Sequence, residues 1–181
     1  MPEPVRLVTA EELQRLPRGR WGYELVEGRV IRMSPVGFEH GRIVVRLLVR
    51  LEEHVRRASL GVVLTEVGFK LRSKPDTVRG PDVAFIRRDR LPAADPRAFW
   101  SGPPDLAIEV LSPEDRPSEV SDKVAEYLAY GVRCVVVVDP HQQIVTSHRP
   151  GAPSTVSRGE DDVDLGDVVD GFRCRAGDIF E

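Results

Sequence analysis

Two acidic residues next to apolar runs are the first candidates for chemistry. Asp82 lies between Pro81 and the run VAFI, and Glu109 lies inside the run LAIEVL. An ionised carboxylate inside such a strand is costly unless it is paired or binds a metal ion. Simpler interpretations stay open: Glu109 on the solvent face of a half-exposed strand, and Asp82 as a turn residue.

Lys123 is a third candidate, because it borders the apolar face of a predicted helix. The helix over residues 118–130 has an apolar stripe of four residues: Val120, Val124, Tyr127 and Leu128. Lys123 follows the first of these by three residues and precedes Tyr127 by four, which places it beside the stripe. A lysine whose stem covers apolar surface while its ammonium group reaches water is the alternative. Because a loop and one helical turn separate Lys123 from Glu109, we expect it near the C-terminal end of that strand.

Two carboxylates and a lysine at one sheet edge are suited to phosphodiester hydrolysis. Carboxylates hold Mg²⁺, which prefers oxygen ligands. The ion polarises the phosphate and lowers the pKa of a bound water. A lysine can orient that water and stabilise the charge that develops on the phosphate.

Glu24 and His40 are further candidates with two interpretations each. Glu24 lies in the strand-like segment YELVEG, either on the surface or directed inward. His40 lies at the first turn of a predicted helix, at the centre of its apolar stripe. A histidine there is often a core residue, although a helix N-terminus also favours anions, so a phosphate contact is the functional alternative.

The pattern of elements predicts an α/β or α+β fold around a mixed central β-sheet flanked by helices. Short strands joined at Glu27-Gly28 are predicted over 23–33, and a long helix over 40–58. Apolar strand-like runs follow at 61–71, 81–86, 106–111 and 134–138. The last two flank the helix at 118–130 and should pair in parallel through this crossover. Residues 150–162 are polar and predicted to form a loop, and the tail through Phe172 and Phe180 should pack back on the core.

Length and composition limit the class of protein. A chain of 181 residues with 41% hydrophobic and 30% charged residues fits one globular domain over 1–181. No apolar run approaches the length of a membrane span, and the N-terminus lacks the layout of a signal peptide, so we expect a cytoplasmic protein. The net charge of −3 gives no overall electrostatic case for a nucleic-acid partner. A Gly-rich phosphate loop, a dinucleotide fingerprint, zinc spacing and a G-x-S-x-G elbow are all absent from the sequence.

An ordered set of motifs resembles the Uma-two family of the PD-(D/E)XK nuclease superfamily. The set is YELVEGRVIRMSPVGFEH, PDVAFI, PDLAIEVLSPEDR, DKVAEYLAYGV with VVDP, and a GF…IF tail. It covers nearly the whole chain and is more specific than any one motif. The resemblance implies a restriction-endonuclease-like core.

By this resemblance Asp82 and Glu109 are the metal-binding acids, helped by the Val110 carbonyl. The usual lysine two residues after the second acid is replaced by Leu111, and the family's lysine corresponds to Lys123 on the following helix. Glu24 and His40 match the family's opening Glu and His and are expected to flank the site. The chain departs from the family at Cys134–Val136, where an acidic residue and aromatics are usual.

The resulting hypothesis is a Mg²⁺- or Mn²⁺-dependent endonuclease acting on DNA, with a homodimer expected because nucleases that read a duplex often pair. The alternative is a catalytically silent nucleic-acid-binding or regulatory module on the same fold, which the net negative charge favours slightly. Hydrolysis of another phosphodiester or nucleotide is a third possibility, since function resides in the site rather than the scaffold.

Overall fold

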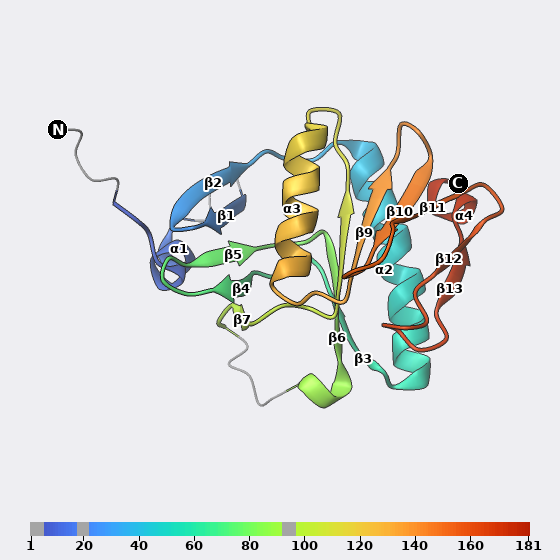
Figure 1. Cartoon of the computed structure of the whole chain (residues 1–181), viewed down its shortest axis with the longest axis horizontal. Coiled ribbons are helices and arrows are strands. Elements are labelled where there is room, and N and C mark those ends of the chain that lie inside the picture. The colour runs from blue at the N-terminus through green and yellow to red at the C-terminus, as the bar shows by residue number, and fades with distance from the viewer. Residues whose placement is uncertain (1–5, 18–21, 92–96) are drawn as a thin grey trace.

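The larger of two main β-sheets forms the centre of the molecule in the computed structural model, which describes residues 6–17, 22–91 and 97–181 (Figure 1). In spatial order its strands are β11 (Thr155–Arg158), β10 (Ile144–His148), β9 (Cys134–Asp139), β8 (Leu106–Val110), β6 (Val83–Arg87) and β3 (Gly61–Leu64). The sheet is mixed, because β8 and β9 are parallel while the other neighbouring pairs are antiparallel. The predicted mixed sheet flanked by helices is therefore confirmed. A short 3₁₀ helix, Arg88–Arg90, follows β6.

The crossover from β8 to β9 passes through helix α3 (Pro117–Ala129), as the sequence predicts. The helix ends before Gly131, whose φ of 98° is left-handed and suits a residue without a side chain. In the parallel register Glu109 lies beside Val137. The C-terminal end of β8 thus lies at the end of the sheet from which the chain enters α3.

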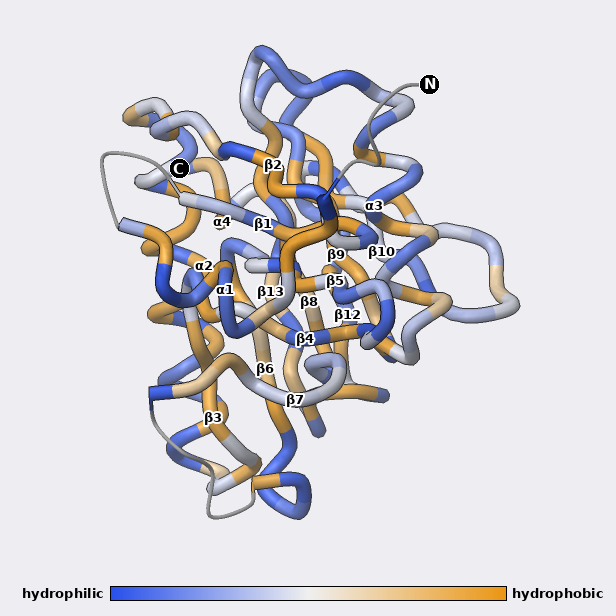
Figure 2. Tube along the Cα trace, turned by 90° about the vertical axis from the view of Figure 1, so that its left-hand side faces the viewer, coloured by the Kyte–Doolittle hydropathy of each residue, from blue (hydrophilic) through white to orange (hydrophobic). Residues whose placement is uncertain are grey.

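The two faces of this sheet are covered by different helices. Leu106, Ile108 and Val110 pack in one core with the long helix α2 (Phe38–Ala58). Ala107 packs in the other core with α3. This alternation follows from the two-residue period of a strand, and it directs the side chain of Glu109 toward α3. Figure 2 shows the apolar character of these central strands.

The second sheet lies beside the first and carries the N-terminal hairpin. Its strands, in spatial order, are β2 (Arg29–Met33), β1 (Gly22–Val26), β5 (Thr77–Arg79), β4 (Phe69–Arg72) and β7 (Trp100–Ser101). The turn predicted at Glu27-Gly28 is confirmed, with φ of 48° and 77° at these two residues. The apolar run 61–71, predicted as one strand, is instead β3 and β4 in different sheets. Glu66 between them has a left-handed φ of 55°, which interrupts an extended strand.

The C-terminal region contains more strand than predicted. The segment 150–162, predicted as a loop, contains β11 and the first residue of β12 (Asp162–Asp164). Its polar composition concealed the strand, because in β11 Ser157 is the one buried side chain and its hydroxyl donates to the Asp162 carbonyl at 3.0 Å.

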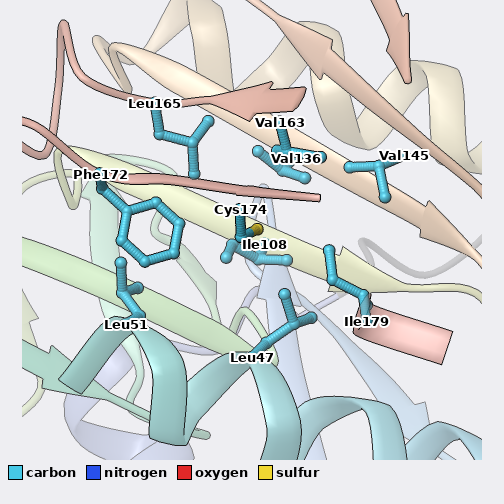
Figure 3. Close-up of a pocket in the computed structure, with 10 residues that line it drawn as sticks. All are labelled: Leu47, Leu51, Ile108, Val136, Val145, Val163, Leu165, Phe172, Cys174 and Ile179. Carbon is cyan, nitrogen blue, oxygen red and sulfur yellow. The ribbon is translucent and has the colours of Figure 1, made fainter. Parts of the chain in front are cut away.

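The tail packs back on the core, as predicted. Strand β13 (Arg173–Arg175) pairs with β12, and the short helix α4 (Gly177–Phe180) lies against α2. Phe172 and Phe180 are both buried in the same core as Leu51. The apolar cavity between this tail, α2 and the sheet has a volume of only about 10 Å³ (Figure 3). This core is closely packed and contains no ligand-sized space.

No helix in the described part of the chain combines the length and the apolar character that crossing a membrane requires. The longest, α2, has five buried side chains along one side: His40, Ile43, Leu47, Leu51 and Val55.

Asp76 fixes the N-terminal helix α1 (Ala10–Arg15) to the second sheet. Its Oδ2 accepts from the Ala10 N–H at 2.8 Å and pairs with Lys70 Nζ at 3.0 Å. Burial opposes ionisation of Asp76, but these contacts outweigh it and lower the pKa of the carboxyl.

We expect Asp76→Asn to lower the free energy of unfolding by about 2 kcal/mol at pH 7. A lowered carboxyl pKa stabilises the fold above the unfolded-state value of about 4 and loses that effect as the pH falls through the folded-state value. Urea denaturation should therefore separate variant from wild type at pH 7 and less so at pH 3. The exposed Asp122→Asn is the control, and an unchanged gap at both pH values would contradict the assignment.

Candidate active site

Asp82, the residue before β6, lies beside Glu109 on the neighbouring antiparallel strand β8. Val83 of β6 pairs with Ile108 of β8, so extending the register by one residue sets Asp82 opposite Glu109. The Val110 N–H donates to Asp82 Oδ2 at 2.7 Å. Asp82 is thus more than a turn residue, because its side chain binds the end of the neighbouring strand.

Glu109 is buried rather than solvated, which contradicts the solvent-face interpretation. Its side chain is 13% exposed and its Oε1 accepts from the Tyr127 hydroxyl at 2.8 Å. The same oxygen pairs with Lys123 Nζ at 3.0 Å. Burial raises the pKa of Glu109 to about 7; Lys123 lowers it, and Asp82 raises it further. Burial thus outweighs the ion pair with Lys123 in setting the pKa of this carboxyl.

Lys123 binds two carboxylates at once. Its Nζ lies 3.0 Å from Glu109 Oε1 and 3.3 Å from Glu24 Oε1, and its side chain is 17% exposed. The interpretation of a lysine whose ammonium group reaches water is therefore wrong. Burial opposes the charge on Lys123, but Glu109 and Glu24 outweigh it and raise the pKa of the ammonium group.

Glu24 brings the second sheet to the site. It lies on β1 with a side chain only 5% exposed, so its inward interpretation is confirmed. The Gly80 N–H donates to its Oε1 at 3.0 Å, and Arg79 Nη1 donates to its Oε2 at 2.8 Å. Burial opposes ionisation, but Lys123 and Arg79 lower the pKa of Glu24. Glu24 is therefore ionised, and each of its two carboxylate oxygens has a hydrogen-bond or ion-pair partner.

His40 reaches Asp82 from the first turn of α2. Its Nε2 lies 3.1 Å from Asp82 Oδ2, and its ring is 8% exposed. Burial opposes its charge, but the bond to Asp82 outweighs this and raises the pKa of His40. Its Nδ1 is buried and meets no hydrogen-bond partner among the described residues. His40 is thus both a core residue and a neighbour of the candidate site.

Comparison with known proteins gives this arrangement a context. Residues 10–177 match the model of the Uma2 family, described as "Putative restriction endonuclease". The chain belongs to the Uma2 family. The resemblance found in the sequence is confirmed.

One solved structure is similar to this Uma2 chain over nearly its whole length. It is a "putative nuclease" from Anabaena variabilis ATCC 29413, with a TM-score of 0.82 and 22% identity, covering 96% of this chain and 97% of that one. At this identity the likeness shows the fold, and it confirms the fold class. No curated protein matches the chain.

Three residues that sequence reasoning did not assign to the site complete the polar cluster of this Uma2 chain. Tyr127 bonds Glu109, while Arg79 bridges Glu24 and Glu126, with Nε 2.6 Å from Glu126 Oε2. Tyr127 belongs to the predicted apolar stripe of its helix. Its spacing of four residues from Lys123 is the one feature of the sequence that could have placed it near the site. Arg79 had no local signal, because its partners come from β1 and α3.

The oxygens of Asp82, Glu109 and the Val110 carbonyl fit a hard divalent cation. The contacts above use Asp82 Oδ2 and Glu109 Oε1, and the second oxygen of each carboxylate takes part in none of them. In addition to burial, the neighbouring carboxylates of Asp82 and Glu24 raise the pKa of Glu109, and a bound cation would offset their negative charge. Within the described residues, no three His, Cys, Asp or Glu side chains form a metal cluster by themselves. A cation here would thus need main-chain oxygen, water or phosphate as well.

Proposed function

We propose that this Uma2 chain is a Mg²⁺- or Mn²⁺-dependent endonuclease that hydrolyses phosphodiester bonds in DNA. The observation that carries the proposal is the buried pairing of Lys123 with Glu109, next to Asp82 at the start of the adjacent strand β6. Membership of a family whose description is "Putative restriction endonuclease" supports the reaction class. The cation, the DNA substrate, a cytoplasmic location and a homodimer are parts of the proposal.

Asp82, Glu109 and the Val110 carbonyl would hold the cation. When bound, it would polarise the scissile phosphate and acidify a water molecule. Glu109 is held by Lys123 and Tyr127, and Asp82 by the Val110 N–H and His40, so the carboxylates are already oriented. Preorganised ligands need little rearrangement when the site is loaded.

Lys123 is suited to orient the attacking water and to stabilise negative charge on the phosphate. An ammonium group has three N–H donors, and the contacts to Glu109 and Glu24 use two of them. The third N–H donor takes part in neither of these two ion pairs. Glu24 and His40 flank the site, where Glu24 holds Lys123 and His40 holds Asp82.

Calorimetric titration of Mg²⁺ or Mn²⁺ into the wild type and into Glu109→Ala is the test. We expect binding that Glu109→Ala removes, while the exposed Glu119→Ala leaves it unchanged. Absence of binding to the wild type, with and without a DNA oligonucleotide, would overturn the metal-dependent mechanism.

A silent nucleic-acid-binding module is the second candidate, favoured by the ion pairs that already engage Lys123. It predicts salt-sensitive binding that survives chelation of metal ions. DNA binding in excess chelator, without turnover at any Mg²⁺ or Mn²⁺ concentration, would favour it over the nuclease.

Tyr127→Phe is expected to weaken metal binding about 10-fold or more, with little change of fold. The substitution removes only the hydroxyl that donates to Glu109 Oε1, and residues that orient metal ligands commonly contribute 10- to 100-fold to affinity. Calorimetry gives the affinity, and Tyr130→Phe, at the residue directly after α3, is the control. Equal affinity in Tyr127→Phe and wild type would show that the hydroxyl does not position Glu109 for a cation.

A further inference from the structure

The outer face of α2 carries an exposed apolar line. Phe38 is 89% exposed, Val45 57% and Val49 58%. The spacings of seven and four residues place the three side chains on one face at 3.6 residues per turn. We call these three residues the outer stripe. It lies opposite the buried side of the helix, which contains Ile43, Leu47 and Leu51.

A helix with apolar residues on two opposite faces is unusual for a surface helix, which normally has one apolar stripe. One face of α2 is covered by the larger sheet and the C-terminal tail. The outer stripe is covered by nothing in the described chain, and Phe38 is the most exposed large apolar residue there. Apolar residues gathered on one exposed face are typical of an interaction surface.

We propose that the outer stripe binds the same stripe of a second copy of this chain, with the two α2 helices antiparallel about a two-fold axis. With the axis at the level of Leu47, Val45 of one copy lies at the level of Val49 of the other. Val45 of each copy then contacts Val49 of the other copy, so the same contact occurs twice. This reciprocity is what a two-fold interface requires.

The charges along α2 favour the antiparallel arrangement. Arg42 lies five residues before the centre, and Glu52 and Glu53 lie five and six residues after it. An antiparallel second copy brings opposite charges to the same level at both ends of the stripe. Within one copy Arg42 also donates to the Phe180 and Glu181 carbonyls, and Glu53 pairs with Arg57, so these groups would add attraction without giving up their present contacts. Phe38 and Arg56, nine residues to either side, also meet, which allows a cation–π contact. A parallel copy would set Arg42 against Arg42 and glutamate against glutamate.

The arrangement specifies the surface that forms the homodimer in the proposed function. His40 lies seven residues before the centre, so the two copies of this residue are offset by about 20 Å along the helix axes. Two candidate active sites would then lie at opposite ends of one helix pair. The inference rests on the homodimer of the proposed function, although its test needs neither metal nor substrate.

Sedimentation equilibrium on the full chain measures the dimer directly. We expect a dimer of the 20.2 kDa wild-type chain. Val45→Glu should raise its dissociation constant about 100-fold or more, because it buries two carboxylates in an apolar contact. Val156→Glu is the matched control. Val156 is 47% exposed and pairs with Thr146, whose neighbour Val145 packs on the α2 side of the sheet, so Val156 faces the other side and should leave the dimer intact. Circular dichroism melts check that both variants remain folded.

Cross-linking tests the register. A mixture of Val45→Cys and Val49→Cys chains should form an intermolecular disulfide faster than either chain alone, with wild type as the blank for Cys134 and Cys174. A wild type that stays monomeric at about 50 µM, a concentration at which a dimer with a micromolar Kd would predominate, would overturn the proposal. So would a dimer that Val45→Glu leaves intact, which would use another surface such as the edge strand β2. Loss of DNA binding in Val45→Glu without any change of mass would assign the stripe to nucleic acid instead. Failure of the nuclease proposal would appear as absent metal binding in an intact dimer.

Discussion

Asp82→Asn is expected to lower metal-dependent DNA cleavage about 1,000-fold or more and to abolish measurable Mg²⁺ binding. Asn has the shape of Asp but lacks the charge that holds a divalent cation. Loss of several kcal/mol of electrostatic stabilisation corresponds to about this factor in rate. The Val110 N–H and His40 can still bond the amide oxygen, so the strand end should remain in place. Single-turnover cleavage of a supercoiled plasmid measures the rate.

The control for this experiment is Asp89→Asn. Asp89 has a 62% exposed side chain and pairs with Arg87 near the other end of β6. It should cleave like the wild type and bind the same metal. If Asp82→Asn kept the wild-type rate at saturating Mg²⁺, the assignment of Asp82 as a ligand would be wrong.

Lys123→Met is expected to have the second largest effect, because it changes both activity and stability. Met fills much of the volume of Lys but leaves Glu109 and Glu24 buried without their shared cation. Breaking a buried ion pair on one side costs about 3–5 kcal/mol. Cleavage should fall about 100-fold or more even when the protein is folded, because the proposed water-orienting group is missing.

The pH dependence of unfolding separates the role of Lys123 from simple packing. Without Lys123 the pKa of Glu109 should rise further above its unfolded-state value. A raised carboxyl pKa favours the fold at low pH, and that contribution is lost as the pH rises through the folded-state value. Urea denaturation should therefore show a larger loss of stability at pH 8 than at pH 5. Lys123→Arg should restore much of the stability, and Lys74→Met, an exposed lysine, should behave as wild type at both pH values. A loss independent of pH would indicate packing alone.

Local patterns in the sequence predicted the elements that position the candidate site. The apolar runs around Asp82 and Glu109 and the helical spacing around Lys123 are short-range signals, and a crossover between parallel strands has few alternatives. Glu24 and His40 were candidates by their positions in a strand and at a helix start, and the family resemblance assigned them to the same site. The predicted strands, helix and crossover are confirmed because each depends on residues close together in the chain.

The tertiary structure decided what depends on distant residues. Local patterns left open whether Glu109 faced solvent or α3, because strand alternation fixes two faces but does not say which is covered. The bridge from Glu24 through Arg79 to Glu126 joins β1, β5 and α3, so no local window contains it. The 61–71 run was split between two sheets by a left-handed residue, and the polar strand β11 was missed because a neighbouring strand supplies its pairing. The outer stripe of α2 also required the structure, since the apolar residues of a helix show which faces are apolar, and only packing shows which of those faces is already covered.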